Sequence, residues 1–490
     1  MSPLTPAALV PEVASRKVSA TLSISECARR KRDAGEEVFA LGFGQSPFPV
    51  PEPMVQECQA HAHVKDYLPV RGLPLLRETI ADWARFHKGV PDVTAEDVLI
   101  GPGSKQLIYL LQAVLQCDLL LPRPAWVTYA PQAELLRRRV FWVETSAEKQ
   151  WKMDPKDLDE ACRLGDSDSP NRLFIFNNPC NPTGTAVTAQ TVAELAAVAR
   201  AHRLLVLADE IYDYQQFDGN HEPFAKHYPE GTITLTGISK WAGAGGWRLG
   251  AFVFPSSLRW LLNAMAVYAS ETHSCVAAPI QYGAVPAFAA HRDTPQGQYM
   301  RHYLKASRSI LGAIGEAFAE VVCGGSPCDM IVPTGGFYAW IDAESGNRRE
   351  AFVRKGITTS GQLAQRLLDE TGVATLPGES YGWPPEKLCL HVAYVDFDGG
   401  AAIEAVGKLP RFSGKKDPAG DAQRSEFGWH QTFVREYAPR VYQGAWKLRE
   451  WLAQTRSPNE PLRELNGDPD RNRLTSKAEK PHLPTLGAGK

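Results

Sequence analysis

The sequence of 490 residues contains no uninterrupted apolar stretch approaching the 18 residues that suggest a membrane-spanning helix. Residues 1–32 also lack the apolar core of a secretory signal peptide. Neither sign of charge is in excess, because 53 basic residues stand against 55 acidic ones and the formal net charge is -2. We therefore expect a cytoplasmic protein without a membrane partner and without a nucleic-acid partner.

The cysteines do not indicate a disulfide framework or a metal site either. The nine cysteines are odd in number and widely scattered, unlike a disulfide scaffold or a zinc knuckle. The tightest pair, Cys323 and Cys328, has no second cysteine pair or histidine pair at zinc-finger spacing nearby, so a surface loop is favoured over a metal site. We predict no metal site, and no internal repeat of solenoid period is present.

The composition is that of an ordinary globular protein, with 44% hydrophobic and 22% charged residues. Between residues 97 and 260, short apolar runs alternate with helical segments, which predicts an α/β domain with a largely parallel sheet. After about residue 300 the pattern indicates a smaller α+β domain. The expected organisation is an N-terminal segment joining the small domain (1–45), a large α/β domain (46–300), a small C-terminal domain (301–455) and a disordered tail (456–490).

One stretch, residues 231–254, places a single lysine in an unusual setting. A strand-like run at 232–236 leads to Lys240, a glycine-rich loop and a second apolar run that opens with Arg248. A lysine among small and apolar residues tends to have a lowered pKa, and its neutral amine can form a Schiff base with an aldehyde. Taken alone, the stretch fits equally well a lysine that extends from a strand end to solvent.

Three further loops carry polar residues where apolar runs end. Ser104 and Lys105 open a helix, where backbone N–H groups can hold a phosphate, although Ser104 also suits a simple N-cap. The loop that begins at Asn177 presents Asn181 between two prolines, and a plain turn is its alternative reading. Asp209 ends an apolar strand and therefore needs a cationic partner. The glycines at 243–246 lack the G-x-G-x-x-G order of a dinucleotide site.

Taken together, these motifs resemble the class I/II aminotransferases of the fold-type I pyridoxal phosphate (PLP) enzymes. The resemblance covers residues 20 to about 410 and rests on Asn181-Pro-Thr-Gly, Asp209-Glu-Ile-Tyr212, Ser239-Lys240 and Gly246-Trp-Arg248-Leu-Gly in the family order. It implies a fold-type I architecture, with a large domain built on a mostly parallel sheet between helices. It also implies that Lys240 carries PLP and moves the substrate proton, and that Asp209 pairs with the pyridinium nitrogen.

The resemblance assigns the remaining contacts as well. Asn181 and Tyr212 would donate to the ring oxygen, and Trp126 would stack on the ring. Gly44, Asn181 and His391 would contact the substrate. The phosphate would be bound by Ser104, Lys105, Ser239, Arg248 and Tyr67, the last reaching across from a partner subunit, so a homodimer with a shared active site is implied.

The chain departs from the family pattern in three places. Gly237 stands where many relatives have a phosphate-binding hydroxyl, for which Thr236 or Ser239 would compensate. His391 stands where the family supplies an arginine for the substrate carboxylate, and no arginine occurs between 367 and 410. Either Arg71 or Asn181 then binds the carboxylate, or the substrate is not an ordinary free amino acid. Last, the chain continues beyond the usual end of the family core.

From the resemblance we expect an aminotransferase that moves the amino group of an α-amino acid to a 2-oxo acid by a ping-pong cycle. The alternative within enzymes is a related PLP reaction such as elimination, cyclisation or decarboxylation, because the scaffold hosts these too. A ligand-sensing regulator is a third hypothesis, which the absence of a preceding helix-turn-helix domain and the retained lysine disfavour.

Overall fold

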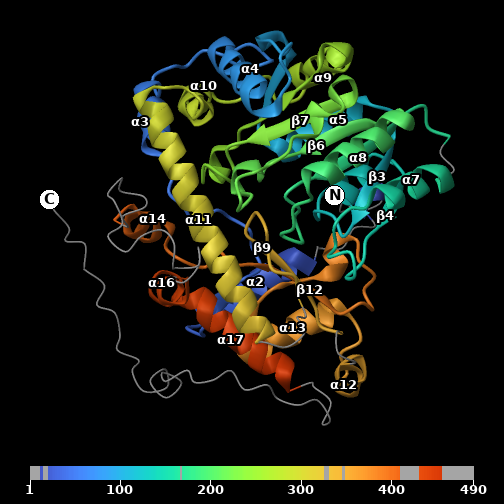
Figure 1. Cartoon of the computed structure of the whole chain (residues 1–490), viewed down its shortest axis with the longest axis vertical. Coiled ribbons are helices and arrows are strands. Elements are labelled where there is room, and N and C mark those ends of the chain that lie inside the picture. Colours follow the sequence, from blue (N-terminus) through green and yellow to red (C-terminus); the bar gives the residue numbers. More distant parts are fainter. Residues whose placement is uncertain are drawn as a thin grey trace, which may run out of the picture.

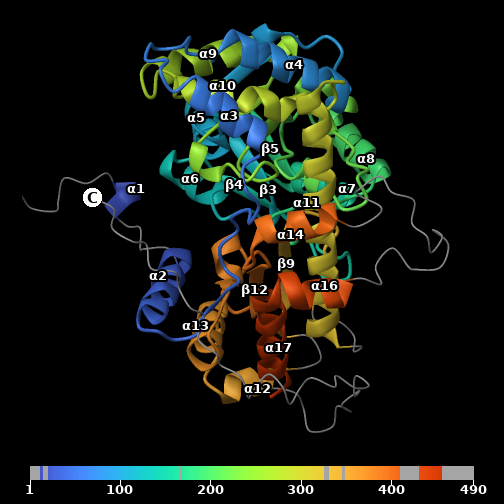
Figure 2. The ribbon, with the colours of Figure 1, turned by 90° about the vertical axis from the view of Figure 1, so that its left-hand side faces the viewer.

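The computed structural model describes residues 11–14, 20–165, 168–324, 330–344, 348–408 and 430–454. A large part occupies the upper half of Figure 1 and a smaller part the lower half. The longest helix, α11 (Pro295–Cys323), runs from one part into the other, as both views show (Figures 1 and 2). Thr294 caps this helix by accepting a hydrogen bond from the Gly297 N–H, and Gly324 ends it in the left-handed conformation.

The large part is built on a sheet of seven strands in the order β2-β8-β7-β6-β5-β3-β4. All neighbouring strands pair in parallel except at β8, which is antiparallel to both β2 and β7. This confirms the predicted largely parallel sheet. The strands are β2 (Val98–Gly101), β3 (Asp118–Arg123), β4 (Val140–Glu144), β5 (Arg172–Asn177), β6 (Leu205–Asp209), β7 (Thr232–Gly237) and β8 (Gly250–Val253).

Both faces of this sheet are covered. In β5, Leu173 and Ile175 pack into one hydrophobic core, while Phe174 and Phe176 pack into another. Alternate residues of a strand point to opposite faces, so the unbroken apolar run reflects helices on each side. The helices of the large part are α3 (Glu52–Ala60), α4 (Pro74–Lys88), α5 (Ser104–Val114), α6 (Tyr129–Leu135), α7 (Pro155–Leu164), α8 (Ala189–Ala201), α9 (Arg259–Ser270) and α10 (Ala278–Ala284).

The smaller part holds an antiparallel sheet in the order β11-β12-β9 and a parallel pair, β1-β10. Its strands are β1 (Phe39–Ala40), β9 (Tyr338–Asp342), β10 (Val373–Ala374), β11 (Leu376–Pro377) and β12 (Cys389–Ala393). Because β1 pairs with β10, the N-terminal segment lies against the C-terminal part of the chain. The helices are α2 (Ala20–Asp33), α12 (Arg349–Arg354), α13 (Ser360–Thr371), α14 (Gly399–Gly407), α16 (His430–Tyr437) and α17 (Pro439–Ala453), and the short α1 (Pro11–Ala14) precedes them.

Several details differ from the sequence predictions. The helix expected over 427–454 is two helices, α16 and α17, because Pro439 begins a new helix and has no N–H to continue the first. Seven of the described cysteines are free, but Cys323 is disulfide-bonded, against the expectation. Cys328, the loop expected at 412–425 and the tail expected at 456–490 lie outside the described residues. Within the described ranges, no helix combines the length and apolarity needed to cross a membrane.

Candidate active site

The candidate site lies where parallel strands of the large sheet end. Strand β5 ends at Asn177, β6 at Asp209 and β7 at Gly237, three residues before Lys240. The register pairs Asn177 with Asp209, so the polar loops leave the sheet side by side. Ligands of such sheets bind beyond the carboxyl ends of the strands. The loops that the sequence singled out therefore meet at one edge.

Lys240 is half-buried at the centre of this edge. Its Nζ donates a hydrogen bond to the Gly44 carbonyl at 2.8 Å and lies 5.5 Å from the ring centre of Phe337 and 5.9 Å from that of Tyr212. Burial lowers the pKa of Lys240 to about 8, with Asp209 opposing the shift and the charges of Lys105 and Arg248 adding to it. Of the two readings left open by the sequence, the desolvated lysine fits this position.

Asp209 is 4% exposed, and its carboxylate forms no ion pair with a cation among the residues that the structure describes. Its carboxylate accepts a hydrogen bond from the Tyr129 hydroxyl at 2.5 Å and one from the Ile211 N–H at 3.3 Å. Burial raises the pKa of Asp209 to about 6, although both hydrogen bonds and the charge of Lys240 lower it. Sequence reasoning did not assign Tyr129, even though it lies three residues after Trp126.

Asn181 and Tyr212 are brought together as the resemblance implied. The Asn181 side-chain amide donates to the Tyr212 hydroxyl at 3.4 Å, and its backbone N–H donates to the Asn177 side chain at 2.7 Å. The Tyr212 hydroxyl also shares a hydrogen bond of 2.9 Å with that of Tyr338. Tyr338, on β9 of the smaller part, was missed by the sequence analysis. The site is therefore built by both parts of the chain.

One end of the site is cationic. Arg248 has a left-handed backbone (φ 55°, ψ 55°), and its guanidinium lies so close to Gly103 that an added Cβ there would be 2.3 Å from it. Lys105 Nζ lies 5.3 Å from the ring centre of Trp126, and burial together with the charge of Arg248 lowers the pKa of Lys105. Ser104 is the first residue of α5, and Gly103 is its N-cap, so Ser104 does not act as the cap that the sequence also allowed.

This end fits a phosphate. A helix N-terminus without a side-chain cap leaves backbone N–H groups for an anion, and two cations lie beside it. Gly237 is the last residue of β7, so the loop that carries Lys240 begins at this edge of the sheet. Ser239, which precedes the lysine in this loop, is half-buried. With the amine of Lys240 and the carboxyl of Asp209, these residues fit a cofactor that joins a phosphate, a reactive aldehyde and a basic ring nitrogen.

The surroundings of His391 differ from the cationic end, because its ring lies against other aromatic rings. His391, on β12, is 2% exposed and lies with its ring centre 4.9 Å from that of Tyr338 and 4.6 Å from that of Tyr381. Burial, with a smaller effect of the Lys240 charge, lowers the pKa of His391 to about 3. A pH dependence from imidazolium near pH 6.5 is therefore not expected from this residue.

Two residues considered for the site lie away from it within one chain. Tyr67 is 91% exposed. Arg71 donates to Glu96 at 3.1 Å and to the Asn263 side chain at 2.6 Å, which ties its loop to α9. The positions of Tyr67 and Arg71 within one chain do not test a role in a partner subunit. The assignment of Tyr67 to a partner's phosphate therefore stays a prediction.

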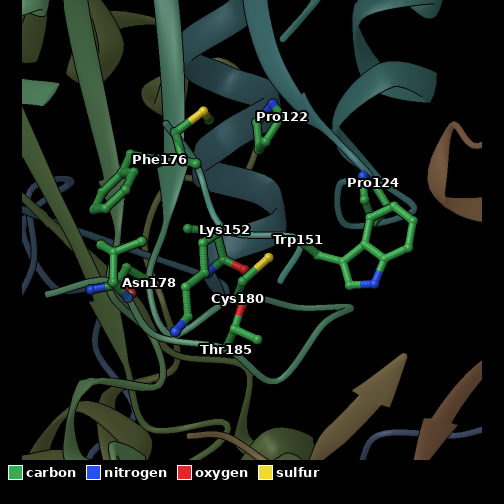
Figure 3. A pocket seen from close by; sticks show the side chains of 11 residues that line it. Pro122, Pro124, Trp151, Lys152, Phe176, Asn178, Cys180 and Thr185 are labelled. Carbon is green, nitrogen blue, oxygen red and sulfur yellow. The ribbon is translucent and has the colours of Figure 1, made fainter. Parts of the chain in front are cut away.

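A small cavity lies along the Asn177 loop. Residues that line it include Pro122 and Pro124, Trp151, and the loop residues Asn178 and Cys180, all labelled in Figure 3. Its volume of about 20 Å³ is enough for roughly one water molecule. The cavity is therefore too small for a cofactor or substrate, and the loop that presents Asn181 packs closely here.

A buried charge cluster supports the segment that carries Asp209 and Tyr212. Lys88 of α4 is 1% exposed and donates to Glu210 at 2.6 Å and to Asp213 at 2.7 Å. Burial alone would lower the pKa of Lys88, but the two carboxylates outweigh it and raise that pKa. Burial would likewise raise the pKa of Glu210, yet Lys88 and His221 lower it to about 2. One lysine thus fixes a residue on each side of Tyr212.

Comparison with known proteins agrees with this geometry. The family described as aminotransferase class I and II matches residues 36–396. An aspartate aminotransferase of Geobacillus stearothermophilus is 30% identical over 414 residues, which cover 82% of this chain and 98% of that protein. An asparagine–oxo-acid transaminase of Streptococcus mutans is 28% identical, covering 81% and 97%. The structure of Thermus thermophilus aspartate aminotransferase with maleate has a TM-score of 0.69 at 24% identity, covering 82% of this chain and 99% of that one.

The fold and the site thus define an α/β enzyme of fold type I, with a lysine, a carboxylate and an anion site at the carboxyl edge of its sheet. The chain belongs to the class I and II aminotransferase family, and its function is that of an aminotransferase. This confirms the family and the fold expected from the sequence motifs.

The Lys88 cluster gives the first testable prediction. In Lys88→Met, two buried carboxylates lose their cation, so the free energy of unfolding should fall by about 3–5 kcal/mol. Urea denaturation at pH 7.5 measures the loss. The matched control is Lys65→Met, because the Lys65 side chain is 86% exposed, and its effect should stay within about 0.5 kcal/mol.

The pH dependence of this loss tests its electrostatic origin. In the wild type, ionised Glu210 stabilises the folded state because its pKa is lower there than in the unfolded chain. This stabilisation is fully present above pH 4.5, the ordinary pKa of a glutamate, and is lost as the pH falls through about 2. Without Lys88, burial raises the pKa of Glu210, so the variant folds with an extra proton and gains stability as the pH falls. The difference in the free energy of unfolding between the wild type and Lys88→Met should therefore become smaller as the pH is lowered from 7.5 to 5. A difference that does not vary with pH would contradict an ionic origin.

Proposed function

We propose that the enzyme binds PLP through Lys240 and transfers the amino group of an α-amino acid to a 2-oxo acid in a ping-pong cycle. The observation that carries the proposal is the half-buried Lys240, whose lowered pKa reflects burial and the charges of Lys105 and Arg248, with Asp209 opposing. A neutral amine is the form that reacts with an aldehyde. At neutral pH, a lysine with a pKa of about 8 supplies roughly a tenth of its population in that form.

Each residue would then have a definite task. PLP would supply an electron sink for negative charge at the substrate α-carbon. Asp209 would pair with the protonated ring nitrogen, and Lys240 would take up and return the α-proton. The contacts to the other groups of the cofactor come from Asn181 and Tyr212 at the ring oxygen, Trp126 at the ring face, and Ser104, Lys105, Ser239 and Arg248 at the phosphate.

The activities in the names of the relatives favour one type of reaction. Among them are aspartate aminotransferases and an asparagine–oxo-acid transaminase. We therefore favour amino-group transfer between an amino acid and an oxo acid over elimination, cyclisation or decarboxylation. We also infer a reducing compartment such as the cytoplasm, because seven of the eight described cysteines are free.

The surface beside the site supports a homodimer. One face of α9 presents Trp260, Val267 and Tyr268, which are 55%, 68% and 38% exposed. Arg71 links this helix to the loop that carries Tyr67, itself 91% exposed. Apolar side chains that cluster on one exposed face are typical of an interface. A second copy on this face would bring Tyr67 to the partner's phosphate site.

Attachment of the cofactor is tested by chemical reduction. Treatment of the PLP-loaded enzyme with borohydride should fix the cofactor covalently, and peptide mapping should find it on Lys240. The Lys240→Ala variant should stay unlabelled under the same conditions. Recovery of the label on Lys105 instead would exclude the proposed role of Lys240.

The role of Asp209 is separable from cofactor binding. Asp209→Ala should still bind PLP but lose about two or more orders of magnitude in the rate of α-proton removal, because a preorganised charge opposite the electron sink is gone. Single-turnover spectroscopy on the loaded variant measures that rate, and the exposed Asp92→Ala serves as the control. A rate equal to wild type would leave Asp209 with a structural role only.

The proposed interface predicts a change of oligomeric state. Val267→Glu places a charge on the apolar face of α9, where burial in an interface would leave it unpaired, so the dimer should dissociate at least tenfold more readily. Sedimentation equilibrium measures the dissociation constant. Val353→Glu is the matched control, because Val353 is 47% exposed on α12 of the smaller part. An equal effect of both variants, or a monomeric wild type, would contradict the α9 interface.

A further inference from the structure

Three rings lie together near Lys240: Tyr338, Tyr381 and His391, which we call the aromatic box. His391 contacts both tyrosine rings, at 4.9 Å and 4.6 Å between ring centres. The box adjoins the reactive lysine through Gly44: the Gly44 carbonyl accepts from Lys240 at 2.8 Å, and a Cβ on Gly44 would lie 2.2 Å from the Tyr338 hydroxyl. Any amino compound held at Lys240 therefore has a substituent within reach of the box.

The box contains polar atoms without partners. Both ring nitrogens of His391 are buried and make no hydrogen bond within the described residues, and the same holds for the side-chain oxygen of Asn181. A buried polar atom left unpaired costs about 1–3 kcal/mol. Nitrogen atoms in this state next to a reactive centre indicate that a ligand completes their hydrogen bonds.

The box also lacks a permanent charge. Tyr338 of β9 and Tyr381 of the short helix η9 (Gly378–Tyr381) are the rings that face His391, and burial raises the pKa of both hydroxyls, so they stay protonated. Lys240 is the charged group that acts on His391, and burial keeps the imidazole neutral at neutral pH. A neutral imidazole offers one N–H donor and one lone-pair acceptor.

These features distinguish between possible occupants. A carboxylate only accepts hydrogen bonds, so it satisfies one nitrogen of His391 and brings an uncompensated negative charge into a buried space. A carboxamide can donate or accept, so it can pair with a nitrogen of His391 in either tautomer, and an ester or ketone accepts from the N–H; none of them adds charge. The main chain fixes the box in place, because the Tyr381 carbonyl accepts from the Ala125 N–H at 3.0 Å, next to Trp126.

We propose that the aromatic box receives an uncharged carbonyl group of the amino donor, so that the enzyme uses amino-acid amides, amino esters and amino ketones about as well as free amino acids. This rests on the proposed function, because it places the donor's amine at Lys240. His391 then determines this specificity, because its imidazole is neutral and does not favour a carboxylate over an uncharged carbonyl group.

The test compares paired donors on the PLP-loaded enzyme. L-Alanine with L-alaninamide, and L-phenylalanine with its amide, give an acid-to-amide ratio of kcat/KM for each pair. The intrinsic difference between acid and amide cancels when a variant is compared with the wild type. His391→Arg should raise the ratio by about 10- to 100-fold, the effect of one charged hydrogen bond. His391→Gln, which stays neutral and both donates and accepts, should leave the ratio within about threefold of wild type.

A binding measurement keeps the test independent of turnover and of the folding of the arginine variant. 2-Methylalanine and its amide lack an α-hydrogen, so calorimetry on the wild type reports their binding without transfer. The acid should bind no more than about tenfold more tightly than the amide. His302→Arg, at an exposed position on α11, is the control and should leave every ratio unchanged.

Two outcomes would overturn the inference. One is wild-type binding of the acid more than about 100-fold tighter than that of the amide, and the other is an unchanged acid-to-amide ratio in a folded, PLP-loaded His391→Arg enzyme. Failure of the proposed function looks different. In that case no member of any pair transfers its nitrogen to an oxo acid, while the calorimetric comparison still decides the occupancy of the box.

Discussion

The structure around the site depends on withdrawing two opposite charges, those of Lys240 and Asp209, from water at the ends of adjacent strands. Burial is the first cause of both pKa shifts: it lowers the pKa of Lys240 to about 8 and raises that of Asp209 to about 6. Mutual attraction would move the two values the other way, so desolvation outweighs it here. At neutral pH Asp209 is therefore still mostly ionised, while Lys240 releases its proton more readily than an exposed lysine does.

Two lysines of this enzyme show how contacts decide between a structural and a chemical role. Lys88 is bonded to two carboxylates at 2.6 and 2.7 Å, and they raise its pKa despite full burial. Lys240 is bonded to a backbone carbonyl instead, and the charges of Lys105 and Arg248 add to the effect of burial. The first lysine holds the segment of Asp209 and Tyr212 in position, while the second is left with an amine that readily loses its proton.

The sequence predicted the largely parallel sheet, and several residues that it singled out lie at one edge of that sheet, for a physical reason. Strands buried on both faces read as continuous apolar runs, and the polar residues that end them, such as Asn181, Asp209 and Lys240, share one edge because most of the strands are parallel. The other contacts arise only in three dimensions. Tyr129 reaches Asp209 from 80 positions away and Lys88 reaches Glu210 from 122 away, and no local periodicity marks either pair. The reversal of β8 and the division of the last helix at Pro439 are set by pairing and by one missing N–H.

The two ends of the site differ in charge, and this difference orients what binds there. At the cationic end, each cation about 4 Å from an anionic oxygen contributes roughly 4 kcal/mol at an effective dielectric constant of 20. Arg248, Lys105 and the start of α5 therefore attract the most strongly anionic group of any ligand to their end. At the other end, His391 is neutral and lies between tyrosine rings, so a second anion gains no comparable attraction there and loses its hydration. One end thus suits a phosphate, while the surroundings of His391, where this chain differs from the family pattern, offer an anion no comparable attraction.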